Sequence, residues 1–280
     1  MSETAIGTLY LVATPIGNLS DISARALQSL QDADFIAAED TRVTRKLLEH
    51  YSIKKPLVSY YQHNTRVSGE KILARILAGE SCALVTDAGT PGISDPGEAL
   101  VKLCADEGIP MIVIPGPCAA VAALSISGLS VERFTFEGFL TTDKKKRSLH
   151  LEELKQEKRT MVFYEAPHKL KRTLSDLYKS FGNRYISISR EMTKIFEETL
   201  RMTLSEAITH FDATPPRGEF VLVIEGEADV PADAENDFEN AIALATGFIN
   251  AGMSVRDAVK KAADETGCSR NALYKAVIAD

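Results

Sequence analysis

The stretch CALVTDAGTPGISDPG, residues 82–97, decides the fold. It opens with an apolar run typical of a strand. The eleven residues from Asp87 to Gly97 that follow hold three glycines, two prolines, two aspartates and two hydroxyl side chains. Glycine permits positive φ angles and close approach to the backbone, whereas proline fixes the chain. Because open α/β sheets bind ligands beyond the carboxyl ends of their strands, this loop predicts one wall of a ligand site.

Apolar runs alternate with amphipathic segments on both sides of this loop, which is typical of the α/β fold class. The pattern predicts strands at 8–13, 34–38, 56–60, 82–87 and 110–115, and helices at 22–30, 41–51, 68–77 and 98–106. A second series predicts strands at 134–140, 160–166, 185–191, 198–203 and 218–226, and its last strands adjoin without a crossover, so we expect a mixed sheet. Two α/β domains, 1–127 and 128–227, are expected.

The C-terminal part of the chain differs in pattern. Residues 227–239, EADVPADAENDFE, carry six acids and no base, which predicts a solvated linker. Residues 236–280 predict a small all-helical domain that ends with a helix, a Gly-containing turn and a second helix capped by Ser269. This rhythm indicates a helix-turn-helix.

Composition excludes several classes of protein. The chain has 280 residues, 45% of them hydrophobic and 25% charged, so it is neither disordered nor collagen-like. No apolar run approaches the roughly 20 residues of a membrane span, and the N-terminus lacks signal-peptide features, so we expect a cytoplasmic protein with no membrane partner. The four cysteines form no CxxC pair and the five histidines show no ligand spacing, so no metal is expected.

Charge is unevenly distributed along the chain. The formal net charge of -7 argues against a protein that coats nucleic acid, and we expect no DNA partner. Between residues 144 and 172, however, ten bases outnumber four acids. This stretch is explained either by a surface that faces a polyanion or by a solvated helix face.

Two further loops resemble the first in composition. They are Thr14 to Leu19, which precedes a helix capped by Ser20 or Asp21, and Pro115 to Ala120, which opens a helix of small residues. Neither GxGxxG nor GxxxxGK[ST] occurs, and aspartates would repel phosphate, so a nucleotide phosphate is a poor ligand. A ribose diol or a cationic sulfonium suits carboxylates better. Tight turns alone would also explain each loop.

Acidic and basic residues also follow the second predicted strand, in AAEDTR at 37–42. Asp40 alone is explained as a helix N-cap, but Glu39, Asp40 and Arg42 together suggest more than a cap.

These segments, together with FEGFL, FYEAPHK, SREMTKIFEE and RGEFVLVIEG, resemble the bacterial 16S rRNA (cytidine-2′-O)-methyltransferase family, also called ribosomal RNA small subunit methyltransferase I. The resemblance extends over about 225 residues, and the C-terminal helices resemble the extra domain of longer members. It implies two α/β subdomains of the tetrapyrrole methylase (class III methyltransferase) type, a homodimer and S-adenosylmethionine in the cleft. The implied reaction is methylation of a cytidine ribose 2′-hydroxyl in the decoding region of 16S rRNA, in the small ribosomal subunit.

The resemblance also assigns a cofactor site. In this superfamily the cofactor lies against three loops and the strand ends of the second subdomain, which correspond here to Pro15, Asp87, Ala88, Gly89, Thr90, Ile93, Cys118, Ala119, Phe163, Tyr164, Gly218, Glu219 and Phe220. Cys118 replaces a serine that is frequent in the family. A thiol is the weaker hydrogen-bond donor, so at this position we expect backbone contacts with the cofactor rather than a side-chain contact.

Catalytic and RNA-binding residues are predicted from position and charge. Glu39 and Asp40 are candidate bases, and Arg42 beside them is expected to bind the RNA phosphate next to the target nucleotide. His63 and His168 are alternative bases. RNA contacts are expected from Lys144, Lys145, Lys146, Arg147, Arg256, Lys260, Lys261, Arg270 and Lys275. Two other functions stay open, a C-methyltransferase of tetrapyrrole precursors and a helix-turn-helix regulator.

Overall fold

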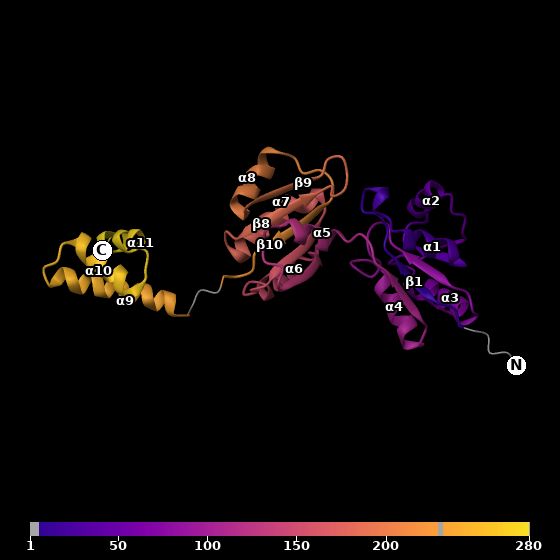
Figure 1. Cartoon of the computed structure of the whole chain (residues 1–280), viewed down its shortest axis with the longest axis horizontal. Helices are drawn as coiled ribbons and strands as arrows, with labels where there is room; N and C mark the ends of the chain where they lie inside the picture. Colours follow the sequence, from indigo (N-terminus) through magenta and orange to yellow (C-terminus); the bar gives the residue numbers. More distant parts are fainter. Residues whose placement is uncertain (1–5, 229–231, 280) are drawn as a thin grey trace. The chain divides into compact units, whose positions relative to one another are not determined.

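The computed structural model describes residues 6–228 and 232–279. The chain forms two compact units, Met1–Glu227 and Ala228–Asp280. The larger unit contains two five-stranded sheets, and the smaller one consists of helices (Figure 1). The predicted α/β fold class with a helical C-terminal part is therefore confirmed.

The first sheet is parallel throughout. It contains β1 (Leu9–Val12), β2 (Phe35–Ala38), β3 (Leu57–Ser59), β4 (Cys82–Val85) and β5 (Met111–Ile114) in the order β3-β2-β4-β1-β5. Side chains of α1 (Ala24–Asp32) and α2 (Thr41–His50) pack on one face, and those of α3 (Thr65–Leu77) and α4 (Gly97–Asp106) pack on the other. All β2 and β4 residues are buried, as expected for central strands covered on both faces.

The start of α1 corrects one expectation. Leu19–Asp21 form a separate short 3-10 helix (η1), capped by the side chain of Asn18. The hydroxyl of Ser23 then accepts the N–H of Ala26 at 3.0 Å. Ser23, rather than Ser20 or Asp21, is therefore the N-cap of α1, because the 3-10 helix uses the earlier polar residues.

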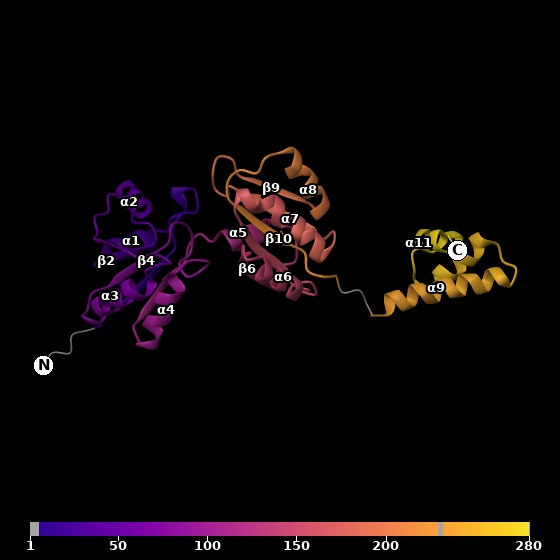
Figure 2. The same ribbon diagram turned by 180° about the vertical axis from the view of Figure 1, so that it is seen from behind.

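The second sheet is mixed, as predicted. Its strands are β6 (Phe134–Phe139), β7 (Thr160–Glu165), β8 (Tyr185–Arg190), β9 (Glu198–Thr203) and β10 (Phe220–Ile224), in the order β6-β7-β10-β8-β9. Only the β6–β7 pair among these described strands is parallel. One face packs against α6 (Lys144–Glu153), α7 (Pro167–Phe181) and α8 (Leu204–Ala213). The two sheets and their helices can be followed from the opposite side in Figure 2.

Helix α5 (Ala119–Ile126) covers the other face of the second sheet. Its residues Ala120, Ala123 and Leu124 form a core cluster with Val162 of β7 and Val221 of β10. The expected first domain, 1–127, included this segment, but α5 packs with the second sheet. Small side chains allow this close contact between helix and strands.

The smaller unit contains α9 (Ala232–Asn250), α10 (Val255–Thr266) and α11 (Arg270–Ala279) around a core of Ala241, Ala245, Val259, Ala262, Ala263 and Leu273. Helix α10 ends at Thr266 and is capped by Gly267, whose φ of 74° is left-handed. Ser269 stands directly before α11, at the predicted cap position.

The predicted linker over 227–239 is wrong in its second half, because α9 begins at Ala232. Residues 229–231 of the predicted linker lie outside the described part of the chain. Alanine and glutamate in ADAENDFENAIALA favour a helix. Within the described residues, none of the helices is long and apolar enough to cross a membrane.

Candidate active site

A cavity of about 600 Å³ lies in the larger unit, within the range expected for small-molecule sites. Loops that follow strands of the first sheet supply one wall: Ile16, Glu39, Thr86, Asp87, Ala88, Gly89, Thr90, Ile93, Ser94 and Asp95. Strand ends, loops and helix starts around the second sheet supply the other: Cys118, Ala119, Phe139, Tyr164, Glu165, Ala166, Pro167, His168, Glu191, Met192, Lys194, Glu219, Phe220 and Val221.

Hydrogen bonds from the backbone and from one hydroxyl hold the three Gly- and Pro-rich loops together at this cavity. Thr14 and Gly89 exchange N–H···O bonds of 2.9 and 3.0 Å, and the hydroxyl of Thr90 donates to the carbonyl of Pro117 at 3.0 Å. Gly89 has a φ of 88°, a conformation that favours glycine. The three loops singled out in the sequence therefore meet at the cavity, where Cys118 and Ala119 of the third loop join the first wall to the second.

Carboxylates dominate this first wall. Burial raises the pKa of Asp95, although its Oδ1 accepts the N–H of Gly97 at 2.7 Å. Burial also raises the pKa of Asp87, and the neighbouring charge of Glu39 adds to the effect. Glu39 accepts a hydrogen bond from the hydroxyl of Thr86 at 2.7 Å. Such a wall suits hydroxyl groups or a cation and disfavours a phosphate.

Of the three predicted catalytic residues, Glu39 lines the cavity. Asp40 and Arg42 are not among the described residues that line it. Asp40 caps α2 through the N–H of Arg42 at 2.8 Å and pairs with its guanidinium at 2.6 Å. These hydrogen bonds lower the pKa of Asp40 to about 2. Asp40 is therefore a helix cap, and a carboxylate held this way is a poor base near neutral pH.

Aromatic side chains give the second wall a different character. The hydroxyl of Tyr164 accepts the N–H of Ala120 at 3.1 Å, and burial raises its pKa to about 12. Its ring lies 5.6 Å from that of Phe139, which is 53% exposed. Lys194 places its ammonium 2.9 Å from Glu191 and 3.2 Å from Glu219.

Most of the residues that the resemblance assigned to the cofactor line the cavity. The exceptions are Pro15, Phe163 and Gly218. Side chains alternate along β7, so Tyr164 faces α5 whereas Phe163 is fully buried in the core under α7. Gly218 has a φ of 82° and packs against Glu191. A Cβ atom added at position 218 would lie 2.4 Å from the Cγ of Glu191, so only glycine fits there.

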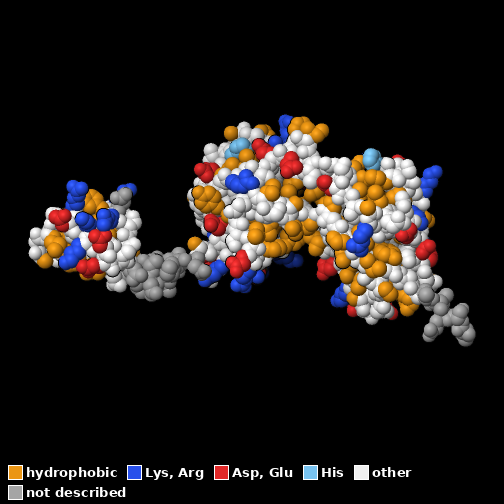
Figure 3. Space-filling view, in the orientation of Figure 1, with side chains coloured by type: hydrophobic (Ala, Val, Ile, Leu, Met, Phe, Trp, Pro, Cys, Tyr) orange, Lys and Arg blue, Asp and Glu red, His pale blue; other side chains and the backbone are white. Residues whose placement is uncertain are grey.

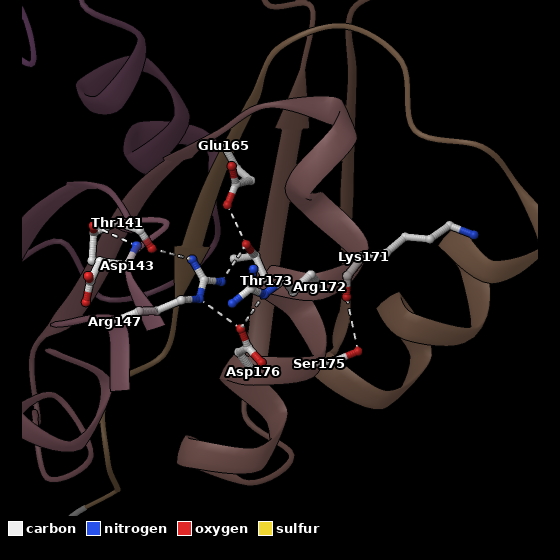
Figure 4. Close-up of polar contacts among 9 residues, drawn as sticks. All are labelled: Thr141, Asp143, Arg147, Glu165, Lys171, Arg172, Thr173, Ser175 and Asp176. Carbon is white, nitrogen blue, oxygen red and sulfur yellow. Dashed lines mark hydrogen bonds and ion pairs between the residues drawn. The ribbon is translucent and has the colours of Figure 1, made fainter. Parts of the chain in front are cut away.

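The predicted RNA-binding residues on α6 divide into two kinds. Lys144, Lys145 and Lys146 are exposed. Arg147 is only 5% exposed, and its guanidinium donates to Asp176 and to Thr173, each at 2.8 Å (Figure 4). The prediction that Arg147 contacts RNA is therefore wrong, because its donors are used inside the unit.

The predicted RNA-binding residues of the smaller unit are exposed: Arg256, Lys260, Lys261, Arg270 and Lys275. The ammonium of Lys261 lies 4.3 Å from the ring centre of Phe248, and Arg270 pairs with Asp264.

Several cavity residues were missed from the sequence, among them Phe139, Glu165, Pro167, Glu191 and Lys194. The motifs FYEAPHK and SREMTKIFEE indicated this wall, but strand pairing decides which of their residues meet.

The two histidines predicted as alternative bases differ in position. His168 lines the cavity. His63 is not among the described residues that line it, and its ring lies 6.3 Å from the ring of Tyr61. In the part of the chain that the structure describes, no three His, Cys, Asp or Glu side chains are grouped so that they could hold a metal ion.

Comparison with known proteins gives matches over most of the chain. Residues 8–208 match the family Tetrapyrrole (Corrin/Porphyrin) Methylases, and residues 249–280 match the RsmI C-terminal HTH domain. Ribosomal RNA small subunit methyltransferase I of Synechocystis sp. is 46% identical over 96% of this chain and 97% of its own length. The protein of the same name from Thermotoga maritima is 46% identical over 79% of this chain and 100% of its own length.

The crystal structure of uroporphyrin III C-methyl transferase from Thermus thermophilus has a similar fold. Its TM-score is 0.56 at 16% identity, over 78% of this chain and 97% of that one. At this identity the likeness concerns the fold alone.

Proposed function

The chain belongs to the tetrapyrrole methylase family and, within it, to the ribosomal RNA small subunit methyltransferases I, and from this premise we propose its substrate. It is an S-adenosylmethionine-dependent methyltransferase, as are the methyltransferases of this family. We infer that it methylates the ribose 2′-hydroxyl of a cytidine in the decoding region of 16S rRNA. The observation that carries this proposal is that the loops assigned to the cofactor by resemblance surround one cavity.

The residues present fit S-adenosylmethionine. Asp87 and Glu39 offer carboxylates to hydroxyl groups or to a positive charge, and Ile16 and Ile93 add apolar surface. Gly89, without a Cβ atom, lets a ligand approach the backbone. Because the first wall concentrates carboxylates, it suits a cofactor that carries a cation and a ribose diol but no phosphate.

When bound, S-adenosylmethionine supplies a methyl group that the positive sulfur already activates. The residues of the chain must then orient the ribose hydroxyl, exclude water and accept a proton. We assign the proton-accepting role to Glu39, because it lines the cavity whereas Asp40 is held by Arg42. His168, on the opposite wall, is the alternative base.

Contacts with RNA are proposed at two places. Lys144, Lys145 and Lys146 are exposed on the first turn of α6, where they can approach phosphates. In the smaller unit we assign the same role to the exposed bases, in agreement with its match to an HTH domain. Because the proposed substrate is ribosomal RNA, we infer a cytoplasmic location for the protein.

A homodimer is part of the proposal. Met111, Ile112 and Val113 of β5 are 37–58% exposed at the edge of the first sheet, and Val121 of α5 is 56% exposed. Hydrophobic side chains also gather over a broad area of the larger unit in Figure 3. Exposed apolar surface of this kind marks an interface, and sedimentation equilibrium that finds a monomer at micromolar concentration would contradict it.

Transfer of tritium from labelled S-adenosylmethionine tests the proposed substrate. Small ribosomal subunits should be methylated far better than protein-free rRNA, and both better than a short duplex carrying the same cytidine, because a cytidine inside a regular duplex is poorly accessible. Label in a porphyrin precursor would support the C-methyltransferase alternative instead. Label in none of these substrates would contradict both.

A further inference from the structure

Two adjacent apolar side chains, Ile195 and Phe196, are exposed in the loop that joins β8 to β9. Ile195 is 94% exposed and Phe196 is 71% exposed, the two highest values among the large hydrophobic side chains that the structure describes. Because apolar surface is unfavourable in water, two neighbours as exposed as these indicate a surface that contacts a partner.

Hydrogen bonds fix the conformation of this loop. The N–H of Thr193 donates to the Oε2 of Glu197 at 2.7 Å, and the N–H of Lys194 donates to the carbonyl of Glu191 at 3.0 Å. Glu191 and Thr193 both have left-handed φ angles, 49° and 64°, which cost free energy in residues other than glycine. Backbone strain of this kind is concentrated at functional sites, so it supports a role for the exposed tip.

The same loop forms part of the cavity wall. Three of its residues line the cavity: Glu191, Met192 and Lys194. The loop also packs against Gly17 of the first wall, where an added Cβ atom would lie 2.5 Å from the Cγ of Lys194. Ile195 and Phe196 directly follow these contacts in the chain, so the exposed tip lies beside the cavity wall.

The apolar tip is small and has charged neighbours. Lys194 precedes it, and Glu197 and Glu198 follow it. Glu198 pairs with Arg190 at 2.6 Å, and Glu197 accepts the N–H of Thr193. The two apolar side chains offer on the order of 300 Å², since a large side chain carries about 150–250 Å².

This area favours a nucleic acid over a second protein chain as the partner. A stable protein interface takes about 800 Å² from each chain, well above what the tip provides. Insertion between two bases, in contrast, needs only one or two apolar side chains, and phenylalanine and isoleucine are among those that proteins use for it.

The proposed reaction creates a vacant place in an RNA stack. A cytidine whose ribose enters a cavity between two walls must leave its stack, and the bases beside it then lose a stacking partner. An aromatic ring can replace that partner, because every base has a face on which a ring stacks. We propose that Phe196 stacks on the RNA base next to the target cytidine, in the place that the cytidine leaves, with Ile195 beside it. This inference rests on the proposed function and adds a base contact to it.

The first test compares side chains at position 196. Phe196→Leu keeps an apolar side chain but removes the ring, whereas Phe196→Tyr keeps the ring. We expect kcat/KM on small ribosomal subunits to fall at least about fivefold in Phe196→Leu, because stacking on an aromatic side chain contributes about this factor or more per base. Phe196→Tyr should retain the wild-type value. Both variants should keep the wild-type affinity for S-adenosylmethionine, since Phe196 is not among the described residues that line the cavity.

The second test uses fluorescence. The chain contains no tryptophan, so Phe196→Trp places a single fluorescent reporter at the tip. Binding of protein-free 16S rRNA should quench this fluorescence, because a base stacked on the indole ring quenches it. Tyr185→Trp is the matched control, since Tyr185 is 57% exposed but begins β8, at the opposite end of the strand from the loop. Its fluorescence should not change when the same RNA is added.

The outcomes separate the inference from the proposed function. Wild-type kcat/KM in Phe196→Leu would overturn the inference, as would equal quenching of the two tryptophan variants. Sedimentation equilibrium that finds a dimeric wild type and a monomeric Phe196→Leu would also overturn it, because the tip would then contact a second copy of the chain. Circular dichroism checks that each variant is folded. A wild-type protein that methylates neither small subunits nor 16S rRNA would instead contradict the proposed function itself.

Discussion

The first wall of the cavity is built on Gly- and Pro-rich loops with distinctive composition, whereas the second wall contains a buried carboxylate, Glu165, that is held by side chains of two helices. Thr14 and Gly89 join two loops of the first wall through main-chain bonds. On the second wall, Glu165 depends on Thr173 and Arg147, which lie on two helices. The first wall can therefore be recognised from the composition of its loops, whereas the second wall can be recognised only from its tertiary contacts.

Removal of Arg147 should have the largest effect. Arg147→Met leaves Asp176 without its buried partner and Thr173 without a donor, so we expect the free energy of unfolding to fall by about 3 kcal/mol, measured in urea. Lys146→Met is the matched control, because Lys146 is exposed and should change stability by less than about 0.5 kcal/mol. Equal stability of the two variants would show that the second wall does not depend on the buried network.

Glu39 and Asp40 are neighbours with different assignments. Glu39→Gln should lower kcat about a hundredfold with little change in cofactor affinity, because general bases contribute at least this factor. Asp40→Asn keeps a helix-capping residue and should retain most of kcat. Single-turnover methylation of small subunits measures both. Equal losses in the two variants would contradict the assignment of the base to Glu39.

The loop of the first wall should control cofactor affinity. Asp87→Ala combined with Gly89→Val removes a carboxylate and places a β-branched residue at a φ of 88°, so we expect calorimetry to show an at least roughly tenfold weaker affinity for S-adenosylmethionine.

Gly108→Val is the control for backbone strain in that loop. It has a φ of 65° and open space where the Cβ would lie, and it is not among the described residues that line the cavity. It should lower stability and leave cofactor affinity unchanged. Unchanged affinity in the Asp87 and Gly89 double variant would place the cofactor elsewhere.

The smallest expected effect concerns the pH dependence of stability at Asp40. The pKa of this carboxyl is about 2 in the folded chain and 3.8 ordinarily, so its contribution to stability is present above 3.8 and is lost as pH falls through about 2. In calorimetric melting at pH 7, the melting temperature of Asp40→Asn should be lower than that of the wild type. The margin should be small because Arg42 is 85% exposed. This difference in melting temperature should shrink towards pH 2. A constant difference across this range would contradict the ion pair as its cause.

Much of the fold was predictable because its signals are local. The strands β1 to β10 are apolar runs separated by glycine, proline and helical patterns, and each was expected within a few residues of its position. The start of α9 was not, because helix propensity outweighed the acidic composition that suggested a linker. The loop from Asp87 to Ile93 could be predicted as a site wall because its glycines, proline and aspartate follow a strand directly in the sequence.

The second wall was only partly predictable. Strand register places Phe220 opposite Glu165 on one side and opposite Arg190 on the other, which brings Glu165, Glu191 and Glu219 to one end of the sheet. No local pattern reveals that register. Likewise, KKKR gives four adjacent bases, and only the packing of α6 on α7 separates the buried Arg147 from the exposed lysines.

The identity of the methylated atom tests the account most directly. Small subunits that lack the modification would be incubated with the full-length protein and S-adenosylmethionine, and their 16S rRNA digested to nucleosides for mass spectrometry. We predict one new product, a cytidine whose added methyl group fragments with the ribose. A methyl group that remains with the base, or one found on another nucleoside, would contradict the proposed reaction.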